Sequence, residues 1–157
     1  MTRYSPNRWN QAGIRESHNC LAYAFNDYDP YRRQFPHPGV KGGMERPVGA
    51  DFFCPKMNQR LMRDNPDLKV VSHNQTCPSG TNKVAMFVDP GTDYHFYRQD
   101  SNGYWSHKPG ERKATNLDES GRRIRDPVRS DRRDEVERLD YSDHCMTFCV
   151  KPGTRVK

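Results

Sequence analysis

The hydrophobic residues of this chain gather into short runs that are separated by long polar stretches. Residues 83–89 (KVAMFVD) are apolar almost throughout, which predicts a strand at the centre of a sheet. Residues 94–99 (YHFYRQ) alternate between the two faces, and residues 104–108 (YWSHK) follow a glycine-containing turn, so the two form a hairpin. Two further strands are predicted at residues 68–72 and 141–151.

Two helices are predicted from capping residues and helical spacing. The first covers residues 19–26, where Asn19 is a suitable N-cap. The second covers residues 54–67, where Pro55 suits the first turn and Asn65-Pro66 ends the helix. Between them, residues 27–53 are rich in proline, glycine and aromatic rings, which predicts a packed loop that walls a cleft.

Residues 111–140 form the most charged segment and contain few apolar residues. This composition predicts a mobile or loosely docked insertion, with a short helix at about residues 130–139. Its seven arginines between Arg122 and Arg138 are interleaved with acids, so we expect a solvated run of charges that pair with one another.

The composition narrows the fold class. A chain of 157 residues is long enough for one domain with a real core. Only 32% of its residues are hydrophobic and 29% are charged, yet 11% are aromatic, which argues against general disorder. We therefore predict one α+β domain over residues 1–157, with the N-terminal helix packed on a small antiparallel sheet, long irregular loops and a charged insertion at about 111–140.

The net charge of +6 suits an anionic partner, such as an anionic cell-wall polymer or an acidic protein face. The basic residues are scattered among acidic ones, so we expect no nucleic-acid partner. Residues 1–13 lack the apolar core of a signal peptide, and no stretch approaches the length of a membrane span. We expect a monomer made as a soluble cytoplasmic chain, which injection, a virion or cell lysis would deliver if it acts outside.

The five cysteines do not form a metal or redox motif. None of them lies at Cys-x-x-Cys spacing. Cys145 and Cys149 would share one face of a strand, too far apart for an easy bridge, whereas Cys54 and Cys77 have the freedom to pair. The simplest interpretation is a reducing compartment with mostly buried thiols, and neither a metal nor a cofactor is predicted.

Cys20 is the candidate nucleophile. It lies where a loop becomes the first predicted helix, in the run SHNCLAYAFN. The partial positive charge at a helix start favours a thiolate, which is how many catalytic cysteines are activated. The alternative is a small hydrophobic residue buried at the start of a core helix.

His95 and His107 lie on the two strands of the predicted hairpin. The turn brings position 95 close to position 108, so the two imidazoles become neighbours if they share a face. One histidine then takes the thiol proton, and the other fixes its tautomer. A partial metal site lacks a third ligand, and Ser106 lacks the Gly-x-Ser-x-Gly elbow of a serine hydrolase.

The order of these parts resembles the NlpC-type branch of the papain-like cysteine peptidases. The resemblance covers residues 17–30 and the run KVAMFVDPGTDYHFYRQDSNGYWSHK, within residues 83–110. It implies that Cys20 is the nucleophile, His95 the base and His107 the orienting residue. It also implies thiolate attack on an amide carbonyl, with the Cys20 backbone N–H as one oxyanion donor.

The function predicted on this basis is a thiol hydrolase that cleaves an amide bond in a peptidoglycan peptide or a protein, in a viral, effector or intracellular setting. The second oxyanion donor is open among the neighbours of Cys20 in sequence: Gln11, Arg15, His18 and Asn19. Two alternatives use the same triad for acyl transfer or glutamine deamidation. A third is a non-enzymatic basic module that binds a polyanion.

Overall fold

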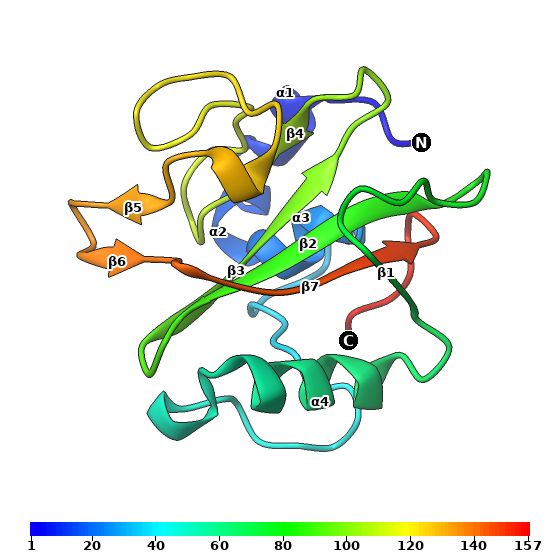
Figure 1. The fold of residues 1–157 in the computed structure, drawn as a ribbon, viewed down its shortest axis with the longest axis vertical. Helices are drawn as coiled ribbons and strands as arrows, with labels where there is room; N and C mark the ends of the chain where they lie inside the picture. The colour runs from blue at the N-terminus through cyan, green and yellow to red at the C-terminus, as the bar shows by residue number, and fades with distance from the viewer.

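The computed structural model describes residues 1–157 as an α+β fold built on one antiparallel sheet (Figure 1). The five strands of this sheet lie in the order β1-β7-β2-β3-β4, so the apolar strand β2 is central, as its composition predicts. The strands are β1 (Lys69–Val71), β2 (Asn82–Asp89), β3 (Asp93–Gln99), β4 (Trp105–Ser106) and β7 (Asp143–Val150). A separate two-stranded ribbon consists of β5 (Arg133–Asp134) and β6 (Leu139–Asp140).

The helices are short except for one. Both predicted helices are present, as α3 (Cys20–Ala24) and α4 (Cys54–Asp64), each ending earlier than expected. Two helical turns in the N-terminal segment were not predicted: α1 (Pro6–Trp9) and α2 (Ile14–Ser17). Two 3-10 turns complete the list: η1 (Gly49–Asp51) and η2 (Pro127–Arg129).

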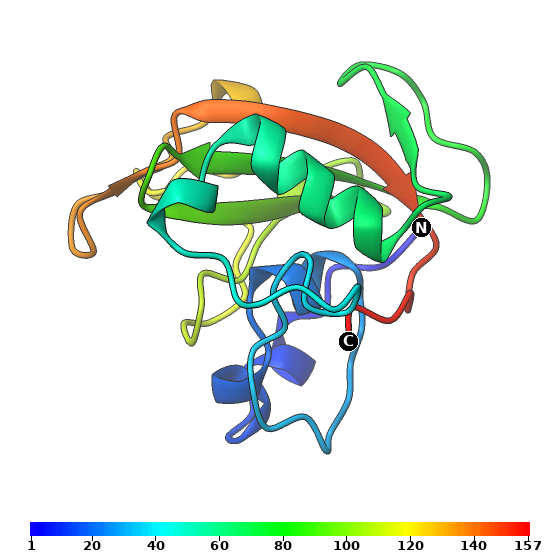
Figure 2. The ribbon, with the colours of Figure 1, turned by 90° about the horizontal axis from the view of Figure 1, so that it is seen from below.

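The sheet has a hydrophobic core on each face. On one face, α3 packs against β3 and α4 packs against β7, as the view from below shows (Figure 2). This core is the larger one and contains Leu21, Phe25, Phe96 and Phe148, all of them fully buried. The opposite face carries a smaller core, which includes Ala85, Phe87, Tyr97, Trp105 and Ile124.

The charged segment 111–140 covers this second face, which corrects the prediction of a loosely docked insertion. Ile124 is completely buried there and its backbone N–H donates to Asn116, while its carbonyl accepts from Trp105 on β4. The predicted helix at 130–139 is also wrong, because the chain forms the β5–β6 ribbon instead. A few apolar anchors therefore suffice to dock a segment whose composition resembles a disordered one.

Two disulfides correct the prediction of mostly free thiols. Cys54 pairs with Cys145 and Cys77 pairs with Cys149, so Cys20 is the one free cysteine. Cys54 and Cys77, which the sequence left free to pair, each bind a cysteine of β7 instead.

A bulge explains the pairing of the cysteines. The β2–β7 register shifts at Cys145, which turns this residue toward the core under α4, where Cys54 begins the helix. Cys145 and Cys149 were expected to share one face of a regular strand. Because of the bulge, they do not. The loop after β1 bonds to Thr147 through His73 and brings Cys77 to Cys149.

A buried ionic network joins α3 to the β3–β4 hairpin. Arg98 is fully buried and donates to Asp100 at 2.9 Å and to the carbonyl of Tyr23 at 3.0 Å. Its guanidinium also lies 3.9 Å from the centre of the Tyr23 ring. Ser106 donates to the other Asp100 oxygen at 2.6 Å and pairs with the Tyr23 hydroxyl at 2.7 Å. The network thus fixes the helix that begins with Cys20.

We expect Asp100→Asn to lower the free energy of unfolding by about 3–5 kcal/mol, because it leaves the buried Arg98 charge without its counter-ion. Urea unfolding measures this change. Asp67→Asn is the control, since Asp67 is exposed and makes no ion pair. An equal, small effect of both substitutions would contradict the role assigned to the network.

Removing the Cys77–Cys149 disulfide with the double substitution Cys77→Ala and Cys149→Ala should cost about 2–4 kcal/mol of unfolding free energy. The bridge closes a long loop, and its loss frees the unfolded chain. Thiol titration of the wild-type protein, unfolded without reductant, should find one thiol, that of Cys20. Five reactive thiols in that titration would show that the cysteines are not paired.

Candidate functional site

His95 and His107 form a hydrogen-bonded pair. The Nε2 atom of His95 lies 2.8 Å from the Nδ1 atom of His107, and both side chains are almost completely buried. The register of the hairpin differs by one residue from the expected one, since Arg98 pairs with Ser106. With this register the odd-numbered residues of both strands share a face, which brings the two imidazoles together.

The hydrogen bonds determine where the protons lie. The Nε2 atom of His107 lies 2.9 Å from the carbonyl oxygen of Leu117, which only accepts, so this nitrogen carries a proton. Burial lowers the pKa of His107 to about 4, so the ring is neutral and its Nδ1 is an acceptor. His95 must then donate through Nε2, which leaves its own Nδ1 as an acceptor with no hydrogen-bond partner in the protein.

Tyrosine rings enclose the histidine pair. Tyr97 stacks on His107 with ring centres 4.6 Å apart, and Tyr141 stacks on His95 at 4.9 Å. The Tyr141 hydroxyl donates to Asp93 at 3.3 Å. This enclosure, together with the neighbouring His107 and Arg112, holds the pKa of His95 well below its usual range.

Cys20 is the first residue of α3, as predicted. The Asn19 side chain caps the helix by accepting from the Ala22 backbone N–H at 3.3 Å. The expected thiolate does not form at rest, because burial raises the pKa of the Cys20 thiol to about 12. The backbone N–H groups of Phe96 and Leu21 lower this pKa, but α3 has only five residues and cannot offset the loss of solvent.

The structure brings Cys20 near the histidine pair without joining them. The Cys20 side chain packs in the core that contains Tyr94 and Phe96, whereas His95 points to the other face of β3. β4 pairs only with the end of β3, so α3 approaches an unpaired stretch of this strand's edge. A negative charge on Cys20 would raise the pKa of Tyr141, which contacts His95, yet no hydrogen bond links the sulfur to either imidazole.

A pocket of about 340 Å³ opens beside His95. Tyr97 and Tyr141 contribute to its walls, and most of its other polar lining is acidic. Arg112 is the one basic residue in the lining and pairs with Asp134 at 2.6 Å. The acidic residues of the lining are Asp93, Glu111, Glu119, Asp134 and Glu137.

Lys108 is a functional candidate that the sequence analysis missed. Its side chain is fully buried, and its ammonium group donates to the carbonyls of Arg15, His18 and Gly110. Burial lowers its pKa to about 8, while a charge on Cys20 acts in the opposite direction. Lys108 therefore fixes the backbone just before Cys20 and places a positive charge within electrostatic reach of the sulfur.

Two of the four candidates for the second oxyanion donor, His18 and Asn19, are already engaged in hydrogen bonds within the protein. The Asn19 amide donates to Pro36 at 2.7 Å and to Tyr94 at 3.3 Å. His18 accepts from the Asp29 N–H through Nε2 at 3.0 Å, and its Nδ1 lies near Ile14 and Ser17 oxygens. Both side chains therefore have structural roles.

Tyr97, Tyr141 and Asp93 are further site residues that sequence reasoning did not identify. Tyr97 had a usable signal, because it lies two positions after His95 and so shares its face of β3. Tyr141 and Asp93 meet only through the docking of the segment before β7, which no local pattern indicates.

The structure contains neither a cluster of metal-binding side chains nor a helix suited to span a membrane. No group of three or more histidine, cysteine, aspartate or glutamate side chains is arranged to hold a metal ion. None of the helices has both the length and the apolar composition needed to cross a membrane.

The fold and the site define an α+β protein whose capped cysteine helix packs beside a buried histidine pair. Residues 10–123 match the family described as "Domain of unknown function (DUF7689)". The chain belongs to this family, and the matched region contains Cys20, His95 and His107.

A curated relative extends the comparison to the whole chain. "Insoluble matrix shell protein 1" of Ruditapes philippinarum is 36% identical over 157 residues, which cover 99% of this chain and 94% of the relative. No solved structure matches the chain.

Stability should fall as the pH drops from about 6.5 toward 4. Unfolded histidines take up protons near pH 6.5, whereas the folded His107 has a pKa of about 4 and that of His95 lies well below its usual range. The unfolded state therefore binds more protons within this window, and the stability present above it is lost.

Urea unfolding across this pH window measures the effect. His18, His37 and His144, whose pKa values are also lowered, contribute in the same direction. His107→Gln should make the decline shallower, by about 3 kcal/mol over the full window. An unchanged slope in this variant would contradict the neutral, buried state assigned to His107.

Proposed function

We propose that this protein is a thiol hydrolase of papain-like type that cleaves an amide bond in a peptide or protein. Cys20 is the nucleophile, His95 the base, and His107 the residue that positions His95. One observation carries the proposal: the hydrogen-bond chain from Leu117 through His107 leaves His95 Nδ1 as a free acceptor. A base in this tautomer is what a neutral thiol requires.

The reaction begins when the Cys20 thiol transfers its proton to His95 Nδ1. The thiolate adds to the substrate carbonyl carbon, and the tetrahedral intermediate collapses as His95 returns the proton to the leaving amine. A thioester on Cys20 results. Water then loses a proton to His95 and attacks the thioester, which releases the acid and restores the thiol.

The raised pKa of Cys20 means that the resting enzyme contains a neutral thiol and a neutral imidazole. Charge separates only when a substrate lies in the pocket. The Cys20 sulfur, which makes no hydrogen bond to either imidazole and does not line the pocket, must then come within reach of His95 Nδ1. Catalytic hydrogen bonds are often absent before the substrate binds. The buried Lys108 ammonium favours the anionic states that follow.

The pocket favours a substrate with a positive charge near the scissile bond. Five of its lining residues are acidic, and Asp134 and Glu119 already interact with Arg112. Glu111 and Glu137 make no ion pair and are available to a lysine or arginine of the substrate. Acyl transfer and glutamine deamidation use the same thioester and differ in the group that enters or leaves.

A second candidate function is a structural role in an extracellular matrix. The relative described as an insoluble matrix shell protein spans nearly the whole chain, and two disulfides are typical of proteins from oxidising compartments. This setting differs from the cytoplasmic one expected from the N-terminus. A matrix component needs the folded, cross-linked domain but no reactive Cys20.

Hydrolysis of a diverse peptide library in ¹⁸O-labelled water tests the proposal. Wild-type protein should produce new carboxyl termini that carry ¹⁸O, and Cys20→Ser should abolish them. His95→Gln should slow the reaction by about 10²- to 10⁴-fold, because the general base is lost. Labelled glutamate in place of glutamine would indicate deamidation, and products joined to an added amine would indicate acyl transfer.

His144→Gln is the matched control, since it removes an exposed histidine that hydrogen bonds to Thr147 and does not line the pocket. Its products should match those of the wild type. If the wild-type protein forms no product from any peptide, or if Cys20→Ser retains full activity, the hydrolase proposal fails and the matrix role becomes the better explanation.

A further inference from the structure

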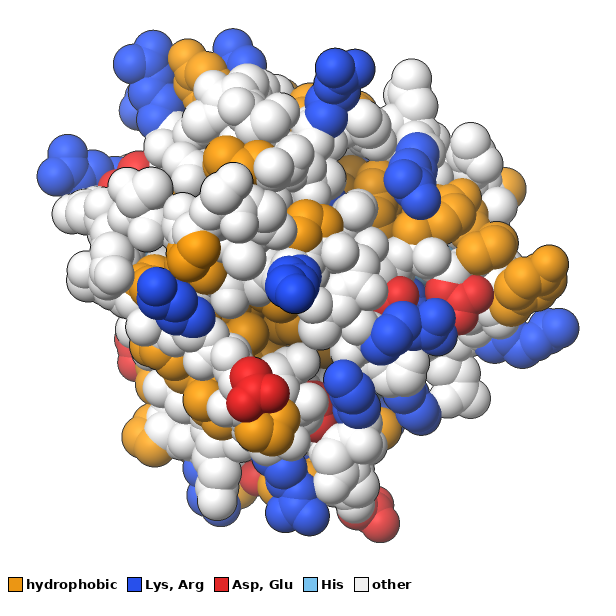
Figure 3. Space-filling model, turned by 90° about the vertical axis from the view of Figure 1, so that its right-hand side faces the viewer, with side chains coloured by type: hydrophobic (Ala, Val, Ile, Leu, Met, Phe, Trp, Pro, Cys, Tyr) orange, Lys and Arg blue, Asp and Glu red, His pale blue; other side chains and the backbone are white.

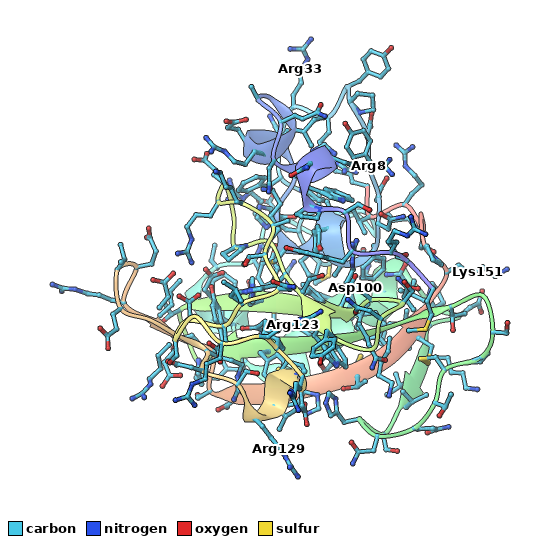
Figure 4. All side chains as sticks on the ribbon, turned by 90° about the horizontal axis from the view of Figure 1, so that it is seen from above. Arg8, Arg33, Asp100, Arg123, Arg129 and Lys151 are labelled. Carbon is cyan, nitrogen blue, oxygen red and sulfur yellow. A yellow bond between two sulfur atoms is a disulfide. The ribbon has the colours of Figure 1, made fainter.

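The segment that covers the second face of the sheet presents a group of exposed arginines. They belong to a hollow of about 1190 Å³ whose lining contains no hydrophobic side chain. Figure 4 shows Arg129 extending away from the protein at η2. We define the arginine surface as four exposed residues of this hollow: Arg122, Arg125, Arg129 and Arg133.

Three aspartates of the same segment accept hydrogen bonds from its backbone N–H groups. Asp118 accepts the backbone N–H groups of Ser120 and Arg122 at 2.9 Å, and also that of Asp131. Asp131 accepts the Ser120 hydroxyl and the Arg133 N–H. The aspartates therefore act as turn-forming residues, and their lone pairs are already engaged.

Asp126 follows the same pattern. It caps η2 by accepting the Val128 N–H at 3.0 Å, and it accepts from His73 at 2.8 Å. Its distance to Arg129 is 4.0 Å, and that from Asp131 to Arg133 is 3.8 Å, both too long for direct hydrogen bonds. The expected pairing of charges is therefore confirmed for Arg129 and Arg133, although these two contacts are ion pairs without a hydrogen bond.

Two neighbouring arginines are used by the fold itself. Arg132 donates to the carbonyls of Pro127 and Tyr141, among others, and its guanidinium lies over the Phe87 ring. Arg123 stacks over Tyr104 at 3.8 Å. Arg122 and Arg125 make no ion pair or side-chain hydrogen bond. The fold thus holds the backbone of the segment in place while four guanidinium groups face solvent.

We propose that the arginine surface binds an anionic polysaccharide that carries sulfate or carboxylate groups. Guanidinium groups bind such groups with two parallel hydrogen bonds, and an array of four matches a polymer with repeated charges. Single-stranded nucleic acid fits less well, because it needs aromatic platforms and this hollow has no hydrophobic lining. The two disulfides also suit a setting where extracellular polysaccharides occur.

The basic residues on another face of the molecule are more dispersed (Figure 3). Figure 3, which views the side at the right of Figure 1, shows lysines and arginines scattered among neutral and hydrophobic side chains. A charge-matched control is therefore available at four exposed positions whose side chains make no hydrogen bond or ion pair. These positions are Arg33, Arg46, Lys56 and Lys151.

The test measures binding of a heparin dodecasaccharide by calorimetry at several salt concentrations. We expect the quadruple variant R122Q/R125Q/R129Q/R133Q to weaken binding at least about tenfold, and to reduce the salt slope by about one per lost contact. The control R33Q/R46Q/K56Q/K151Q has the same net charge, +2 in place of +6, and should bind nearly as well as the wild type.

If both variants lose heparin affinity to the same extent, binding depends only on the net charge of the protein, and the proposal is overturned. Binding of duplex DNA as tight as that of heparin, through the same four arginines, would overturn the choice of polysaccharide. Both variants should unfold at the wild-type temperature, since the substituted side chains are exposed. The Cys20→Ser variant should bind heparin normally, so failure of the hydrolase proposal leaves this result unchanged.

Discussion

The buried ion pair between Arg98 and Asp100 is the constraint on which the rest of the structure depends. Two charges without solvent must satisfy each other, and here they also engage Ser106 and Tyr23. The result is a fixed junction between the cysteine helix α3 and the β3–β4 hairpin. The candidate site lies across this junction, so any change in the network moves Cys20 relative to His95.

Enclosure gives the site its chemical character. Tyrosine rings and the segment before β7 exclude water from the histidine pair, which keeps both imidazoles neutral and fixes a single proton arrangement. The same exclusion keeps the Cys20 thiol protonated. The candidate nucleophile and the candidate base are therefore both neutral in this structure. This is consistent with a hydrolase that separates charge only in the presence of its substrate.

The charged segment 111–140 both stabilises the fold and forms part of the molecular surface. Its aspartates form turns, Ile124 anchors it on the sheet, and Arg132 holds five carbonyl groups. Because Asp118, Asp126 and Asp131 accept backbone hydrogen bonds, the turns are ordered and present the exposed arginines on a defined surface.

The sequence by itself determined the strands of the five-stranded sheet, the two main helices, the position of Cys20 at a helix start and the proximity of His95 to His107. These features depend on local periodicity, capping and a short turn, which act between near neighbours. Only the tertiary structure decided the disulfide pairing, because a one-residue bulge at Cys145 changes its face. It also decided the thiol state of Cys20 and the contact of Tyr141 with His95, since both depend on burial by distant segments.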